Sequence, residues 1–83
     1  MVALAKGFHM YEIVVKLGGR RIRRLLTVRE EPPLSAVERF LLTVVRTELP
    51  LLDITVVYQG AWQWSVYADG QQIGWAAADE KRG

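Results

Sequence analysis

The side chains best suited to chemistry in this sequence are a run of arginines, Arg20-Arg21-Ile22-Arg23-Arg24. Guanidinium groups bind phosphates and carboxylates through paired hydrogen bonds, so the run is typical of an anion-binding surface. The same charges also occur on solvated strands, where they protect a sheet edge against aggregation. Because the side chains of a strand alternate between two faces, only two or three of the four arginines can serve one surface.

Residues suited to catalysis are few. The chain has a single histidine, His9, and no cysteine, and its serines are Ser35, which we assign to a helix cap, and Ser65, which lies on a predicted strand. The adjacent pairs Glu30-Glu31 and Asp79-Glu80 are interpreted as solvated charge, because nothing nearby predicts the burial that shifts a carboxyl pKa. No nucleophile–base set and no cluster of metal ligands can be assembled. We therefore expect a protein that is not an enzyme and folds without a metal or cofactor.

Length and charge point to one small domain spanning residues 1–83. Residues 1–46 carry nine basic and four acidic side chains, whereas residues 47–83 carry two and five. A chain divided in this way can present a positive surface to phosphate or to an acidic protein. The sequence has no apolar run long enough for a signal peptide or a membrane span, so we expect a cytoplasmic protein with no membrane partner.

The first half of the chain predicts a hairpin followed by a helix. Apolar residues alternate from Phe8 to Leu17, Gly18-Gly19 forms a two-residue turn, and the return strand runs from Arg20 to about Arg29. This register places Val15 opposite Ile22, Tyr11 opposite Leu26 and Ile13 opposite Arg24. The other face then carries Lys16, Arg21, Arg23 and Arg29 together with Glu12 and Thr27.

The double proline Pro32-Pro33 ends the strand, and Ser35 with Glu38 forms a capping box from which a helix should start. Pro50 ends this helix near Glu48 or Leu49. The helical spacing predicts one buried stripe, formed by Val37, Phe40, Leu41, Val44 and Val45. Leu42 lies off that stripe and is a candidate exposed contact.

The last third predicts three more strands. Asp53–Gln59 alternates, and Asp69-Gly70 is a strong hairpin turn between Trp62–Ala68 and a final strand that reaches Ala78. Counting outward from the turn pairs Ala68 with Gln71, Val66 with Ile73, Trp64 with Trp75 and Trp62 with Ala77, which places all three tryptophans on one face. The opposite face then carries Gln63, Ser65, Tyr67, Gln72 and Gly74. A two-residue turn at Gly60-Ala61 would put Val57 beside Trp64. A three-residue loop aligns Ile54, Val56 and Tyr58 with the tryptophans instead, and we favour it because it gives one apolar face. The tail from Asp79 to Gly83 is expected to fray.

The order β-β-α-β-β-β predicts an α+β two-layer sandwich, in which a five-stranded antiparallel sheet carries one amphipathic helix on one face. One helix does not easily cover five strands, so part of the sheet should stay open for a partner. Tryptophans are usually core residues in a small domain, yet at least one should lie at the rim as an interface residue.

The capped helix, the segment Val56-Val57-Tyr58-Gln59-Gly60-Ala61-Trp62-Gln63-Trp64, and the later Tyr67-Ala68-Asp69-Gly70 and Trp75 resemble those of small phage-encoded anti-CRISPR proteins, over residues 35–75. This resemblance implies a non-enzymatic inhibitor that binds a bacterial CRISPR surveillance complex or nuclease and blocks DNA recognition. The positive net charge departs from inhibitors that act as acidic DNA mimics. Inhibition would then use a basic face docked on protein or guide RNA.

Two functions remain open from the sequence. The first is a small intracellular binding protein, a phage or mobile-element inhibitor that occludes a surface of a bacterial protein or ribonucleoprotein complex. The alternative is a nucleic-acid-binding module that combines basic side chains with an aromatic platform. The partner-binding residues expected from the sequence are Lys16, Arg20, Arg21, Arg23, Arg24, Arg29, Trp62, Trp64 and Leu42.

Overall fold

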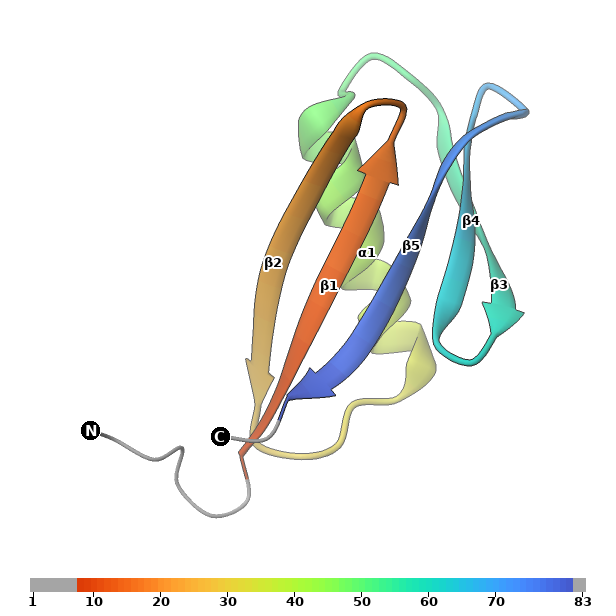
Figure 1. The fold of residues 1–83 in the computed structure, drawn as a ribbon. Helices are drawn as coiled ribbons and strands as arrows, with labels where there is room; N and C mark the ends of the chain where they lie inside the picture. The colour runs from red at the N-terminus through yellow and green to blue at the C-terminus, as the bar shows by residue number, and fades with distance from the viewer. Residues whose placement is uncertain (1–7, 82–83) are drawn as a thin grey trace.

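A computed structural model of the chain describes residues 8–81 and shows one helix lying across one face of a five-stranded antiparallel sheet (Figure 1). In chain order the elements are β1 (His9–Leu17), β2 (Arg20–Val28), α1 (Leu34–Glu48), β3 (Ile54–Gly60), β4 (Gln63–Ala68) and β5 (Gln71–Lys81). This is the α+β two-layer arrangement expected from the sequence. No helix in residues 8–81 has the length and apolarity needed to cross a membrane.

The strand order is β2-β1-β5-β4-β3, so the first and last strands of the chain lie side by side in the middle of the sheet. Every neighbouring pair is antiparallel. The N-terminal hairpin therefore joins the C-terminal three-stranded meander through the β1–β5 ladder alone. Both ends of the sheet, β2 and β3, are edge strands.

The register of the N-terminal hairpin is confirmed. Val15 lies opposite Ile22, Tyr11 opposite Leu26 and Ile13 opposite Arg24. The turn uses a positive φ of 60° at Gly18, a conformation that glycine adopts without strain. Tyr11, Ile13, Val15 and Leu17 consequently all face α1 and are buried.

The helix begins one residue earlier than expected, at Leu34, and the predicted capping box does not form. Pro33 occupies the cap position in an extended conformation, and no side chain in the described part of the chain caps the helix. The carboxylate of Glu38 instead accepts a hydrogen bond from the indole Nε1 of Trp64 at 2.9 Å. Trp64 is buried, so its indole N–H needs an acceptor from the protein. The first turn of α1 is partly solvated, so its amide groups depend less on Glu38. The predicted helix end at Glu48 is confirmed.

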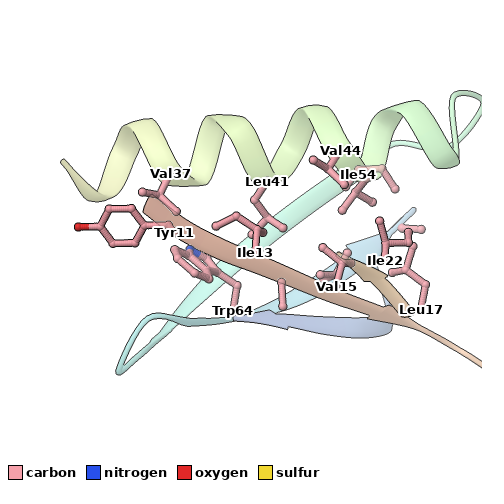
Figure 2. Packing of buried hydrophobic residues seen from close by; sticks show 14 residues of the cluster. Tyr11, Ile13, Val15, Leu17, Ile22, Val37, Leu41, Val44, Ile54 and Trp64 are labelled. Carbon is pink, nitrogen blue, oxygen red and sulfur yellow. The ribbon is translucent and has the colours of Figure 1, made fainter. Parts of the chain in front are cut away.

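The core lies between α1 and the sheet, and most of the predicted helix stripe contributes to it (Figure 2). Phe40 is an exception, because it is only half-buried and packs at the margin of the cluster, and Leu42 also packs there rather than standing free. The stripe residues that are buried are Val37, Leu41, Val44 and Val45. They meet Ile13, Val15, Ile22, Ile54 and Trp64 from the sheet.

The β4–β5 hairpin corrects the predicted register. Ala68 pairs with Gln71 as expected, but a β-bulge then shifts the ladder, so that Val66 lies opposite Gly74 and Trp64 opposite Ala76. Gly74 therefore lies on the helix side rather than on the opposite face, and Trp75 lies opposite Ser65, away from α1. The three tryptophans do not share one face.

Close packing against β1 requires glycine at the position that follows this bulge. A Cβ atom added to Gly74 would lie 1.9 Å from the backbone oxygen of Lys16, so no residue with a side chain fits there without moving the backbone. The next core position, between Trp64 and Val15, is filled by the small residue Ala76. A second indole at that position would compete with Trp64 for the space under α1.

The β3–β4 hairpin confirms the favoured alignment. Ile54, Val56 and Tyr58 lie opposite Ala68, Val66 and Trp64. The loop itself is shorter than expected, because Ala61 and Trp62 are the only residues between the strands and a bulge near Gln59 supplies the extra residue.

The expected fraying of the C-terminal tail is wrong for its first residues. Asp79, Glu80 and Lys81 belong to β5 and pair with β1, where Lys81 lies opposite Met10. An ion pair of 3.2 Å between Lys81 Nζ and Glu12 Oε1 holds this end of the strand. Arg82 and Gly83 lie outside the described residues.

Candidate binding surface on the open sheet face

The face of the sheet turned away from α1 has no covering layer in the described part of the chain (Figure 1). We call it the open face. It carries the side chains that alternate with the buried ones on every strand. On the basic half of the sheet these include Lys16 of β1 and Arg21, Arg23 and Leu25 of β2, and on the other half Trp75 of β5, Tyr67 of β4 and Val57 of β3.

One row of this face crosses all five strands. Arg21 lies opposite Lys16, Lys16 opposite Trp75, Trp75 opposite Ser65, and Ser65 opposite Val57. Cross-strand partners share a face and have Cβ atoms about 4.5–5.5 Å apart, so these side chains form a continuous strip. The strip runs from two cations at one edge to an aliphatic side chain at the other.

The two cations in the row are unusual. Lys16 and Arg21 face each other directly, both are exposed, and neither forms an ion pair with any residue between 8 and 81. Like charges directly opposite each other destabilise a ladder. Folding therefore gains nothing from this pair, whereas a bound anionic group would be held by both.

Arg23, one step along β2 on the same face, is already engaged. Its Nη2 lies 2.6 Å from Glu12 Oε2. Glu12 also forms an ion pair with Lys81, and Lys81 forms a second ion pair with Asp79 at 3.5 Å. The hydrogen bond from Lys81, with help from Arg23, lowers the pKa of the Glu12 carboxyl below its ordinary value. This network is the charged border of the open face.

Three of the arginines expected at the site lie elsewhere. Arg20 and Arg24 come from the helix side of β2, where both reach Glu48 at the end of α1, at 2.6 and 3.9 Å. Arg29 lies beyond β2, with its guanidinium carbon 5.5 Å from the ring centre of Phe8. The arginine run is thus divided, as strand alternation requires, and of its members Arg21 and Arg23 reach the open face.

The other residues predicted for the site do not lie together in the structure either. Trp64 is 1% exposed and belongs to the core, while Trp62 is half-buried against Tyr11. Leu42 packs against the core from α1. The aromatic residue that does reach the open face is Trp75, 43% exposed and absent from the predicted set. Gly74 was the signal that could have found it, because a glycine inside a strand often marks a bulge, and a bulge reverses the facing of the next residue.

Apolar side chains complete the surface. Leu25 is 61% exposed and Val57 is 45% exposed, and both lie on the open face together with Trp75. Val14 and Ala77, which are half-buried partners in the central ladder, connect them along the sheet. Aromatic and arginine side chains surrounded by apolar surface are typical of protein interfaces.

No protein-family model matches this sequence, and neither a curated protein nor a solved structure matches it.

Proposed function

We propose that this protein is a non-catalytic binding protein that docks the open face of its sheet on an acidic surface of a partner protein and thereby occludes that surface. The observation that carries the proposal is the juxtaposition of Lys16, Arg21 and Trp75 in one row. The two cations repel each other in the free protein, so an acidic partner is the ligand that would relieve them.

A protein partner is favoured by the aliphatic side chains on the same face. Leu25 and Val57 expose apolar surface that a protein core patch can bury, whereas phosphates and sugars offer little to cover them. Trp75, at the centre of the row, has the residue type and position of an interface hot spot. The resemblance to small phage-encoded anti-CRISPR proteins names one partner to test first, a bacterial CRISPR surveillance complex.

A second function is supported by one feature of the row. Trp75 lies directly beside Lys16, and an exposed indole next to a cation is the combination on which single-stranded nucleic acids stack. Binding of this kind depends on phosphate neutralisation and is lost steeply as salt rises. Salt dependence therefore separates the two functions.

The test uses a charge-reversal variant of the two cations in the row, Lys16→Glu with Arg21→Glu. We choose these rather than Arg23, because Arg23→Glu would set a carboxylate beside Glu12 and disturb the ion-pair network. The matched control is Arg39→Glu with Arg46→Glu, which makes the same change of net charge at two exposed positions of α1. Each variant and Trp75→Ala is titrated against the purified surveillance complex and against single-stranded DNA and RNA oligomers.

The proposal predicts that Lys16→Glu/Arg21→Glu and Trp75→Ala each weaken binding to the protein partner while the α1 control binds as the wild type does. It also predicts that the wild-type complex persists when salt is raised from about 50 to 200 mM. Binding to the oligomers that vanishes over this range would favour the nucleic-acid function. A partner bound equally well by all variants would exclude the open face.

A further inference from the structure

A pocket lies at the end of the sheet where β5 extends beyond β4. The β4–β5 ladder ends with Gln63 opposite Ala77, whereas β5 continues to Lys81 beside β1 alone. The space left next to the end of β5 is closed by the β3–β4 turn and by the loop after β2. It forms a cavity of about 320 Å³, lined by Tyr11, Glu31, Ala61, Trp62, Ala78, Asp79 and Glu80. A cavity of this size suits a small ligand or one long side chain.

The turn that carries Trp62 is strained. Ala61 and Trp62 are its two central residues and have positive φ angles of 53° and 58°. A turn of this type favours Asn-Gly or Asp-Gly, as the Asp69-Gly70 turn of the same protein illustrates. A bulky residue adopts a positive φ only at an energetic cost, and strained conformations of this kind are enriched at functional sites.

Two hydrogen bonds of the Trp62 backbone, one to a side chain and one to another backbone group, hold the residue in this position. Its amide donates to the hydroxyl of Tyr58 at 3.2 Å, and its carbonyl accepts from the amide of Ala78 at 2.9 Å. The indole then lies against Tyr11, with ring centres 6.1 Å apart and planes inclined by 32°. Both aromatic residues line the pocket.

Tyr11 supplies a second observation. Its side chain is 4% exposed, and its hydroxyl points away from the core beside the first turn of α1 (Figure 2). Tyr11 lines the pocket, and its hydroxyl makes no hydrogen bond with any residue from 8 to 81. Burial, and then the negative charges of Glu80 and Glu31, raise the pKa of this phenol. The hydroxyl therefore stays neutral and is available as a hydrogen-bond partner.

The rim of the pocket is acidic. Glu31 forms no ion pair within the described residues, while Glu80 has the imidazole of His9 at 3.1 Å and Asp79 shares Lys81 with Glu12. A cation in such a pocket is attracted by the charge of the carboxylates and by the π-faces of the aromatic rings. An anion would be repelled. A bare metal ion would leave the two rings without a role.

We infer that this pocket is a binding site for an alkylammonium group, the charged end of a lysine or methylated lysine side chain or of a small quaternary amine. The carbon atoms next to the nitrogen pack on Trp62 and Tyr11, and the charge lies toward Glu31 and Glu80. The strained turn holds the indole in place before the ligand arrives. This site is separate from the row on the open face and does not depend on its function.

The test is a titration of the wild-type protein with choline, followed by NMR through the indole Nε1–H signals. Its uncharged counterpart 3,3-dimethyl-1-butanol has nearly the same shape and serves as the control ligand. The inference predicts saturable shifts of the Trp62 signal with choline, weaker shifts with the alcohol, and no matching change at Trp75, which lies on the open face. Equal responses to both compounds, or equal shifts at Trp62 and Trp75, would overturn it.

Two variants test the rim. Glu31→Gln should weaken choline binding by about tenfold, the equivalent of losing one favourable charge contact. Glu30→Gln changes the neighbouring exposed carboxylate, which does not line the pocket, and should leave the affinity unchanged. Glu80→Gln provides a second rim variant. Unchanged affinity in both Glu31→Gln and Glu80→Gln would contradict the site. A trimethyllysine peptide that binds more tightly than choline would identify a protein side chain as the ligand, and the reverse order a free amine.

Discussion

At the scale of single residues, the contact between Trp64 and Glu38 joins the two layers of the fold. The indole is buried, and its N–H reaches the Glu38 carboxylate from α1 at 2.9 Å. A buried donor that loses its acceptor costs free energy, because water is not there to replace it. The same glutamate was expected to cap the helix, so its role follows from the sheet below rather than from its place in α1.

We expect Glu38→Ala to lower the free energy of unfolding by about 1–3 kcal/mol, because it leaves the Trp64 N–H without a partner. Urea titration followed by circular dichroism measures the change. Arg39→Ala, at the adjacent exposed position of α1, should stay within about 0.5 kcal/mol of the wild type. Equal losses in the two variants would show that the hydrogen bond contributes nothing.

Gly74 lies where the backbones of β1 and β5 pack too closely for a side chain. Alanine at this position would place Cβ 1.9 Å from the Lys16 oxygen, a contact with backbone that can be relieved only by moving β1 or β5. We expect Gly74→Ala to destabilise the protein by at least about 1–3 kcal/mol, the usual cost of overpacking. Gly19→Ala is the control, because nothing lies within 4 Å of a Cβ there and its φ is not positive. A midpoint of urea unfolding that is the same for both variants would contradict the close packing of β1 and β5 at Gly74.

At the scale of elements, Glu12 connects three strands. It lies on β1 and receives Arg23 from β2 and Lys81 from β5. The pKa of Glu12 is lowered, chiefly by the Lys81 hydrogen bond, and the pKa of Lys81 is raised, chiefly by the Glu12 hydrogen bond. The Arg23 and Lys81 side chains are exposed and Glu12 is partly exposed, so water and salt weaken these pairs.

The shifts set the sign of a pH effect. Because the folded pKa of Glu12 is lowered, its contribution is complete above the unfolded pKa and is lost as the pH falls through the folded value. The raised pKa of Lys81 adds a contribution that is complete below its unfolded pKa and is lost at strongly alkaline pH. We expect Glu12→Gln to lower Tm near neutral pH and the difference from wild type to shrink below about pH 4.

Thermal unfolding followed by circular dichroism over this pH range measures the difference. Glu30→Gln, at an exposed position without an ion pair to any residue between 8 and 81, is the control and should follow the wild-type curve. A Tm difference for Glu12→Gln that stays constant from neutral to acidic pH would argue against the ion pairs. High salt should reduce the effect, since the network lies at the surface.

Elements were largely predictable because their signals are local. The alternation in β1 and β2 and the Gly18-Gly19 turn determine a hairpin register that the structure confirms. The helix was predicted to within one residue at its start, although the cap chosen for it was wrong. In the C-terminal hairpin the turn was right and the register beyond it was wrong, because a bulge leaves no signature in simple alternation.

At the scale of the whole molecule, the sheet has one face covered by α1 and one open face without a covering layer in residues 8–81. Trp64, on the covered face, is 1% exposed, and Trp75, on the open face, is 43% exposed. We expect Trp75→Phe to remove the component of tryptophan fluorescence that acrylamide quenches most easily, while stability changes by no more than about 0.5 kcal/mol. Acrylamide quenching and urea titration of wild type and variant provide the two measurements. Unaltered quenching would mean that the open face is covered in solution.

The sequence by itself determined the composition of the layers. Period-two and helical spacing, the glycine turns and the double proline decide five strands and one amphipathic helix, since each depends on neighbours a few residues apart. The excess of basic side chains in the first half also follows from the chain alone. The chain alone does not determine which of these basic side chains meet at one surface.

Only the tertiary structure decided the strand order and which side chains lie together on the open face. Pairing of β1 with β5 joins residues from the two ends of the chain, so Lys16 comes to lie beside Trp75. Glycine at position 74 avoids a clash with the backbone oxygen of Lys16, and the bulge that precedes it turns Trp75 outward. A contact between residues so distant in sequence has no counterpart in local periodicity, because steric exclusion acts only once the strands are side by side.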